Sequence, residues 1–283
     1  QHGDVATLHV DRLRGRYLLY HKVGSNHGLT SRRSMIVLES RDAIHWEGYH
    51  GYRQWHEAFF ADDYDDLLAM QRGFRIAEFY GQTLHQVGPL YIAVQNVFTV
   101  GLPLKNKAAQ NPAGRSHLRL AFSHDGLHWR YPCGRPSFVE GGGPGMFDGG
   151  FLSANGNFVE HGDDMWLYIY GSRTDHGWGI TPDFQLDPTI PFNEQNNLTS
   201  TVVAKFKRDR FASLASTYRC SFDAEAGPRQ GDQLTINAIT RNSGSVRVAI
   251  AEQSVPLHLS LRKSDSLPGF SFDDCIPFSG DSV

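Results

Sequence analysis

The sequence predicts an all-β protein, with the blades of a β-propeller followed by a C-terminal β-sandwich segment. Glycine (29 of 283 residues) and aromatic residues (12%) are frequent, and alanine-, leucine- or lysine-rich helical stretches are missing. A short turn motif recurs along the chain, and an aromatic strand pattern recurs in front of it. Such internal repeats are typical of architectures in which each unit buries its apolar face against the next.

The repeated turn ends in a tryptophan. Ser40–Trp46 (SRDAIHW) recurs 83 residues later as Ser123–Trp129 (SHDGLHW). A β-like run precedes each copy, RSMIVLE before the first and HLRLAF before the second. Aspartate and glycine favour turns, and the large apolar tryptophan favours a strand that packs on its neighbour. A weaker third copy is VVAKF at 202–206, followed by KRDRF.

Two further strands are expected in front of each turn. The nearer one is aromatic and apolar: RYLLYHK at 16–22, PLYIAVQ at 89–95 and MWLYIYG at 165–171. The earlier one carries an acid: Asp4 in HGDVATLHV, Glu78 in FRIAEFYGQ and Asp148 in GMFDGGFLS. Each unit therefore reads as four antiparallel strands, which is the pattern of a propeller blade.

The three acids are candidate catalytic residues. The first strand of a blade lines the central channel, so acids in one register of three first strands would converge at one mouth. The alternative for Asp4 and Asp148 is that they cap turns or strand starts, as acids beside glycine often do. Glu78 stands in mid-strand, where a carboxylate is disfavoured unless it lines a polar cavity.

Only three blades are visible, whereas propellers typically close with about 4–8. We expect the remaining blades to lie outside this chain, on its N-terminal side, or to be too diverged to show. Residues 1–214 form the predicted propeller region. In the predicted sandwich segment, 215–283, the runs QLTINAIT (233–240) and SVRVAIAE (245–252) alternate as strands do.

Composition and missing motifs exclude several function classes. A net charge of −3 argues against a general nucleic-acid binder. Mean hydropathy is −0.40 and no run of about 18 apolar residues occurs, so we expect no membrane span. The 14 histidines include no HExxH, and there is no CxxC, P-loop, GxSxG or strand-linked GxGxxG. We therefore expect neither a catalytic metal nor a cofactor.

The residue types at the predicted channel mouth suit carbohydrate chemistry. Cleavage of a glycosidic bond needs one carboxyl group that protonates the leaving oxygen and a second that attacks the anomeric carbon or activates water. Sugars also bind to aromatic rings and planar donors. The candidate substrate-binding residues are Arg33, Tyr80, His176 and Trp178.

The local sequence places these candidates and also offers ordinary explanations for them. Tyr80 follows Glu78 by two residues, so both side chains point to one face of a regular strand. His176 and Trp178 belong to a glycine-flanked loop after a strand, a common position for a binding loop. That loop could equally be a solvated turn, and Arg32–Arg33 could be a surface charge pair.

Three motifs carry a family resemblance. The SxDxxHW turns, RDRFASL at Arg208–Leu214 and LPGFSFDDC at 267–275 resemble bacterial glycoside hydrolase family 32-like proteins. These belong with family 43-like enzymes to the five-bladed propeller glycosidases. The resemblance implies that Glu78 is the acid and Asp4 the transition-state-stabilising aspartate. The Asn-Asp-Pro-Asn motif that carries the invertase nucleophile does not occur, which leaves Asp148 for that role.

The resulting hypothesis is a glycoside hydrolase that cleaves an oligo- or polysaccharide with inner-strand carboxylates. Its expected partner is the carbohydrate substrate, with neither nucleic acid nor a membrane involved, and its expected location is secreted or periplasmic. The competing hypothesis is a non-catalytic propeller that binds glycans or protein partners, with the acids as polar fillers.

Overall fold

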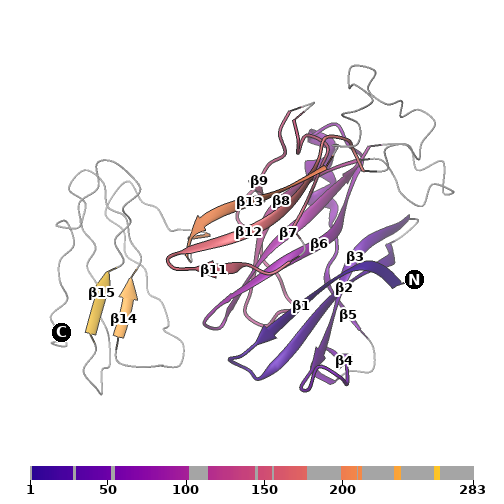
Figure 1. Ribbon diagram of the computed structural model, residues 1–283. Coiled ribbons are helices and arrows are strands. Elements are labelled where there is room, and N and C mark those ends of the chain that lie inside the picture. Colours follow the sequence, from indigo (N-terminus) through magenta and orange to yellow (C-terminus); the bar gives the residue numbers. More distant parts are fainter. Residues whose placement is uncertain are drawn as a thin grey trace. The chain divides into compact units, whose positions relative to one another are not determined.

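The computed structural model describes residues 2–27, 30–51, 55–101, 114–143, 146–154, 156–176, 199–208, 210–211, 233–236 and 258–261. The chain divides into two compact units, Gln1–Thr217 and Tyr218–Val283. The described part of the first unit consists of three antiparallel sheets and one α-helix, so the all-β class is confirmed (Figure 1). No described helix is long and apolar enough to cross a membrane.

The first sheet has the strand order β1-β2-β3-β4, with β5 also paired to β3. Its strands are β1 (His2–Asp11), β2 (Arg16–His27), β3 (Thr30–Ser40), β4 (Glu47–Gly48) and β5 (His56–Phe59). A short 3₁₀ turn, Tyr49–Gly51, follows β4. The predicted four-strand order of the unit is confirmed here.

The second sheet repeats this order as β6-β7-β8-β9. Its strands are β6 (Ile76–Val87), β7 (Leu90–Val100), β8 (Gly114–Ser123) and β9 (Ser137–Val139). Every residue of β7 after Leu90 is buried. A strand covered on both faces is mostly apolar, as β7 is, although its buried residues include Gln95 and Asn96.

A helix, α1 (Asp63–Gln71), connects the first two sheets. Asp62 and Asp65 form a capping box at its start, which satisfies backbone N–H groups that lack a partner within the helix. The buried Asp65 also accepts a 2.5 Å hydrogen bond from Arg119 of β8. The helix is therefore fixed to the second sheet by a buried ion pair.

The third sheet departs from the predicted pattern. Its first strand is split into β10 (Phe151–Ser153) and β11 (Val159–His161), both paired with β12 (Asp164–Ser172). The outer strand β13 (Thr199–Lys207) pairs with β12 along nine residues. No strand pairs with the far side of β13 among the described residues.

In the second unit the structure describes one parallel strand pair, β14 (Gln233–Ile236) with β15 (His258–Leu261). The β14 strand lies in the predicted run at 233–240, whereas the predicted run at 245–252 lies outside the described residues. A β-sandwich in 215–283 and closure of the three sheets into a propeller both stay predictions.

The two copies of the repeated turn have the same hydrogen bonds. In the first, Ser40 Oγ accepts from the Ala43 N–H (2.9 Å), and Asp42 Oδ1 accepts from the His45 N–H (2.8 Å). In the second, Ser123 Oγ accepts from the Gly126 N–H (2.8 Å), and Asp125 Oδ1 accepts from the His128 N–H (2.8 Å). The repeat seen in the sequence is thus a repeat of local structure.

The second turn is also a contact between the first two sheets. Tyr20 donates a 2.5 Å hydrogen bond to the Gly126 carbonyl, and Arg16 donates a 2.9 Å bond to the Asp125 carbonyl. Both donors belong to β2 of the first sheet. A Cβ at Gly126 would stand 3.0 Å from Leu18 Cδ1 and from the Tyr20 hydroxyl.

A buried polar cluster lies beside this turn. Asp11 is fully buried, and its carboxylate accepts hydrogen bonds from Arg16 Nε (3.1 Å), Gln86 Nε2 (2.9 Å) and the Tyr91 hydroxyl. Burial acts to raise the pKa of Asp11, but these hydrogen bonds lower it to about 2. Asp11 and Arg16 come from the first sheet, and Gln86 and Tyr91 from the second.

The turn glycine gives the first prediction. Gly126 has φ +86° and is packed, whereas Ala43 at the matching position has φ +61° and is exposed. Gly126→Ala should lower the free energy of unfolding by about 1–3 kcal/mol, because it adds left-handed strain and a close contact. Ala43→Gly is the matched control and should be neutral or slightly stabilising. Urea unfolding measures both, and equal small effects would contradict this packing.

The Asp11 cluster predicts how the stability of the protein depends on pH. Asp11→Ala should lower the free energy of unfolding by about 3–5 kcal/mol at pH 7, since it leaves Arg16 buried without its partner. Because the folded-state pKa lies below the ordinary 3.8, the stabilisation by Asp11 is fully present above about pH 4. It is lost as the pH falls towards about 2.

Urea unfolding between pH 7 and pH 2 tests this dependence. Between pH 7 and pH 2, the free energy of unfolding of the wild type should fall by about 2 kcal/mol more than that of the Asp11→Ala variant. The exposed Asp163→Ala variant is the control and should stay within about 0.5 kcal/mol of wild type at pH 7. Parallel pH profiles for wild type and Asp11→Ala would contradict the role of Asp11.

Candidate functional site

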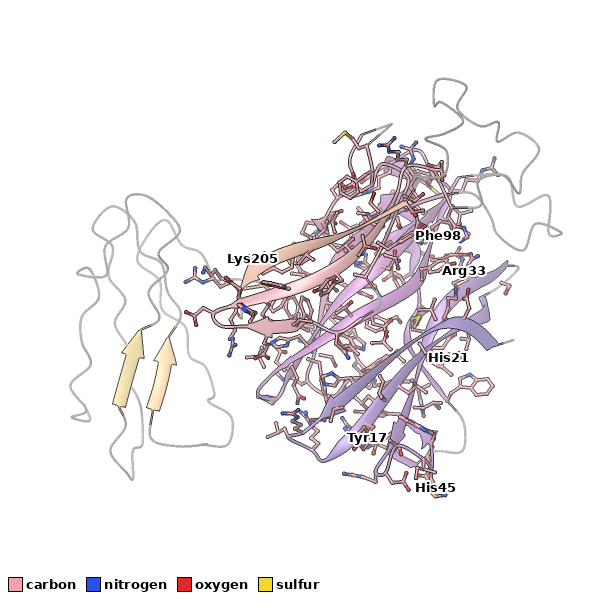
Figure 2. The ribbon with its side chains drawn as sticks, viewed as in Figure 1. Tyr17, His21, Arg33, His45, Phe98 and Lys205 are labelled. Atoms are coloured by element: carbon pink, nitrogen blue, oxygen red, sulfur yellow. The ribbon has the colours of Figure 1, made fainter. Side chains whose placement is uncertain are left out.

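Glu78 is a buried carboxylate paired across two sheets. It lies on β6 opposite Phe98, and 4% of its side chain is exposed. Arg33 of β3 places Nη1 2.5 Å from Glu78 Oε2. Figure 2 shows Arg33 and Phe98 near one another, and the guanidinium carbon lies 5.5 Å from the Phe98 ring centroid. Arg33 is therefore half of a nearly buried ion pair and not a surface charge.

The neighbouring arginine has a different partner. Arg32 makes two hydrogen bonds to the Asp66 carboxylate of α1, at 3.0 and 2.8 Å. The interpretation of Arg32 and Arg33 as a surface charge pair is therefore wrong. Asp66 also accepts from the Ala77 N–H (2.9 Å), one residue before Glu78. The helix thus fixes the backbone at the start of β6.

Tyr80 lies at an irregularity of β6. The pairing with β7 shifts register between Phe79 and Gly81, so Tyr80 is the extra residue of a β-bulge. Its ring packs edge-on against Phe98 (5.9 Å) and Phe151 (5.3 Å), and its hydroxyl lies 3.0 Å from His176 Nε2. Burial raises the pKa of Tyr80, so the phenol is neutral at ordinary pH.

Tyr80 and Glu78 share Arg33 as a neighbour, and the regular alternation on which the sequence prediction relied is interrupted between them. The Arg33 guanidinium lies 5.3 Å from the Tyr80 ring centroid while it pairs with Glu78. A simple period of two does not hold across a bulge.

Asp4 reaches the same tyrosine through a lysine. Its side chain is 78% exposed and forms an ion pair with the buried Lys22 of β2. The Lys22 ammonium lies 3.8 Å from the Tyr80 ring centroid. The hydrogen bond from Lys22 is the main cause that lowers the pKa of Asp4, whereas burial lowers the pKa of Lys22.

Lys22 was missed from the sequence although a signal for it exists. It ends the run RYLLYHK, where a lysine interrupts the apolar character of the strand. A lysine in a buried stretch needs an acid or an aromatic face, and here it has both. The structure brings Asp4, Lys22, Tyr80, Arg33 and Glu78 together in one cluster from two sheets.

Asp148 makes no hydrogen bond or ion pair with this cluster among the described residues. The prediction that it sits in a first strand is wrong, because it belongs to a turn closed by the Gly149 N–H donating to the Met146 carbonyl (3.1 Å), ahead of β10. Glycine-rich sequence on both sides favours such a turn over a strand. Its Oδ1 is buried with no hydrogen-bond partner in the part of the chain that the structure describes.

The predicted binding loop is only partly described. His176 exchanges two backbone hydrogen bonds with Gly114 of β8, at 2.8 and 3.3 Å, which anchor the loop to the second sheet. Its ring lies 5.1 Å from Phe98 and 5.3 Å from Phe151. His176 is thus a packed residue and not part of a solvated turn. Trp178 lies outside the described residues.

The cluster combines two carboxylates, two cations and an aromatic ring, with the charges balanced in pairs. Such a set can hold a polar, uncharged ligand by hydrogen bonds and ring contacts, and it can supply two carboxylates for acid–base chemistry. In the part of the chain that the structure describes, no three His, Cys, Asp or Glu side chains gather as a metal site.

Comparisons with known proteins give distant structural matches only. No family model matches the sequence, and no curated protein matches it. One similar solved structure is a glycoside hydrolase, with 12% identity, a TM-score of 0.43, and coverage of 76% of this chain and 47% of that one.

Two further structures are similar at the same level. A Bombyx mori GH32 beta-fructofuranosidase has 13% identity and a TM-score of 0.38, covering 56% of this chain and 28% of its own. A thermostable family-43 glycoside hydrolase has 13% identity and a TM-score of 0.38, and the match covers 60% of this chain and 51% of that one. The chain spans about half or less of their lengths. Similarity at this level shows neither the activity of this chain nor the role of any of its residues.

The Arg33–Glu78 pair gives a prediction on stability. Arg33→Met alone should lower the free energy of unfolding by about 3 kcal/mol, because Glu78 stays buried without its cation. A double-mutant cycle with Glu78→Gln should give a coupling energy of about 1–3 kcal/mol in urea unfolding. The control cycle uses the more exposed pair Arg208–Glu160, with 30% and 52% of the side chains exposed, whose coupling should stay below about 0.5 kcal/mol. Equal coupling in both cycles would contradict a buried ion pair at Glu78.

Proposed function

We propose that this protein is a glycoside hydrolase acting on an oligo- or polysaccharide, and that its three sheets are propeller blades. The observation that carries the proposal is a pair of carboxylates, Glu78 and Asp4, whose partner cations Arg33 and Lys22 both contact the ring of Tyr80. The buried Glu78 carboxylate is compensated by Arg33, and this pair lies beside the ring of Tyr80, where a sugar could bind. A secreted or periplasmic location fits such a substrate.

In this proposal Glu78 protonates the leaving oxygen of the glycosidic bond. Its carboxyl group must then carry a proton, so in this proposal the bound sugar displaces Arg33 Nη1 from Glu78 Oε2 and the freed carboxylate takes a proton from solvent before it delivers that proton to the leaving oxygen. Asp4 is the second carboxylate, which stabilises the developing positive charge on the sugar. Its exposure and its hydrogen bond from Lys22 keep it ionised, as that role needs. Asp148 remains a candidate for the nucleophile.

Tyr80 and its neighbours would bind the sugar ring. Arg33 and Lys22 can donate to sugar hydroxyls, and the Tyr80–His176 pair fixes the position of an aromatic edge. A His176 ring packed between Phe98 and Phe151 is rigid enough to hold that pair in one geometry. No residue distinguishes a furanose from a pyranose substrate, or exo from endo cleavage.

A second candidate function is glycan binding without catalysis. The observation that favours it is that each carboxylate already has a cation beside it. Acids held in this way orient Lys22 and Arg33 as hydrogen-bond donors and need not react. Incubation of the protein with a panel of plant and algal polysaccharides, followed by product chromatography, separates the two functions. Binding without released sugars favours the second.

The acid role of Glu78 predicts a difference between substrates. Glu78→Gln should lower turnover of natural glycans by about 10²- to 10⁴-fold, because the amide cannot donate the proton. A glycoside with an acidic phenol as leaving group needs little protonation, so turnover of that substrate should fall much less. Steady-state kinetics on both substrates measure this.

The control is Glu160→Gln, the same change at an exposed position of β11 outside the cluster, which should leave both rates unchanged. Equal losses of Glu78→Gln on both substrates would remove Glu78 from the acid role. Unchanged activity on both would remove it from the site.

A further inference from the structure

The charges of the candidate cluster balance only while Glu78 is ionised. Its two cations, Lys22 and Arg33, are paired with the carboxylates of Asp4 and Glu78. The proposed reaction needs Glu78 to carry a proton. Protonation removes one of the two negative charges, so the cluster that is set to react has a positive charge in excess.

This excess charge falls on Arg33. Lys22 keeps Asp4 as its partner after Glu78 is protonated, whereas Arg33 loses the carboxylate oxygen 2.5 Å from its Nη1. The Arg33 side chain is only 15% exposed, so water compensates its charge poorly. Asp4 is a weak substitute, because it is already paired with Lys22 and 78% of its side chain is in water.

A negative group on the ligand would compensate Arg33. A guanidinium carries further N–H groups besides the one at Nη1, and it binds carboxylates and phosphates through two parallel hydrogen bonds. A sulfate presents similar oxygens. A sugar hydroxyl can also accept from Arg33, but it is neutral and leaves the buried charge without a counter-ion. An oxyanion on the sugar is therefore favoured over a hydroxyl once Glu78 is protonated.

We propose that the substrate carries an oxyanion on a sugar beside the scissile bond, either the carboxylate of a uronic acid or a sulfate ester, and that this group takes Arg33 away from Glu78. The inference rests on the proposed function, because it concerns the acid of that reaction. It adds the class of substrate, since a neutral sugar would leave the Arg33–Glu78 pair intact.

The exchange of partners also explains how Glu78 receives its proton. Its side chain is 4% exposed, and a buried carboxylate without a counter-ion is strongly disfavoured. Once the oxyanion holds Arg33, Glu78 takes one proton from solvent, and this proton passes to the leaving oxygen during cleavage. The charge of the substrate thus prepares the acid that cleaves it.

Binding to Glu78→Gln tests the exchange without catalysis. The amide has nearly the size of the acid but no charge, so nothing competes with the ligand for Arg33. An oligogalacturonide or a sulfated galactan oligosaccharide should bind Glu78→Gln at least about 10-fold more tightly than it binds wild type. The carboxyl-reduced or desulfated form of the same oligosaccharide should bind both proteins equally. Isothermal titration calorimetry at constant ionic strength measures these affinities.

Glu160→Gln is the matched control. Glu160 pairs with Arg208 at 3.3 Å, so the variant also removes a carboxylate from an arginine, but outside the cluster and at a more exposed place. Its affinity for each oligosaccharide should stay within about twofold of wild type, because water screens Arg208. Equal affinities of wild type and Glu78→Gln for both charged oligosaccharides would overturn the inference.

Proton uptake by the wild type is a second readout that needs no variant to fold. Titration with the charged oligosaccharide at about pH 6, in buffers of different ionisation enthalpy, should show about one proton taken up per ligand bound. The neutral form should show none. The other titratable groups around Glu78 are Asp4 of β1, Lys22 of β2, Asp66 of α1, Tyr80 of β6 and His176 after β12. They remain in Glu78→Gln, so uptake that persists in this variant would overturn the role of Glu78.

Cleavage rates separate this inference from the proposed function. Wild type should cleave the charged member of one matched pair at least about 100-fold faster than its neutral form, and the pair that responds identifies a carboxylate or a sulfate. Equal cleavage of charged and neutral forms would overturn the inference and support the hydrolase alone. Tighter anion binding by Glu78→Gln without cleavage of any substrate would support the anion site and overturn the hydrolase.

Discussion

The buried contact of Asp11 with Arg16 and Tyr91 is the constraint on which the rest of the structure depends. Arg16 donates to the Asp11 carboxylate, to Glu39 (2.7 Å) and to the Asp125 carbonyl (2.9 Å). It therefore joins three strands of the first sheet, and it fixes them to the second sheet through the Asp125 carbonyl and the Tyr91 hydroxyl (3.1 Å). Apolar packing alone tolerates sliding, whereas buried charges that must meet their partners tolerate little.

This fixed orientation places the candidate site. Two contacts of the cluster cross from one sheet to the other, Arg33 to Glu78 and Lys22 to the Tyr80 ring, whereas the Asp4–Lys22 ion pair lies within the first sheet. The first sheet supplies both cations and Asp4, and the second supplies Glu78 and Tyr80. A shift of the sheets by one residue would separate each buried group from its partner and leave it without compensation.

The repeated turn shows how one local structure takes on two roles. Both copies hold their aspartate by the same backbone bonds and by a histidine ring at 2.7 Å. The hydrogen bond to His45 is the main cause that lowers the pKa of Asp42. The first copy is exposed, while the second receives hydrogen bonds from Arg16 and Tyr20. Residues in contact with the turn, and not the turn itself, make the second copy part of the core.

The sequence by itself determined the local structure: the all-β class, the strand order of the first two units and the repeated turn. These follow from alternation, glycine and aspartate spacing, which act over a few residues. It also singled out Glu78, because a carboxylate inside an apolar strand is unusual on any fold. Only the tertiary structure decided its partner Arg33, 45 residues away, and the role of Lys22. It also placed Asp148 in a turn and Tyr80 in a bulge, since pairing between distant strands sets register and no spacing along the chain encodes it.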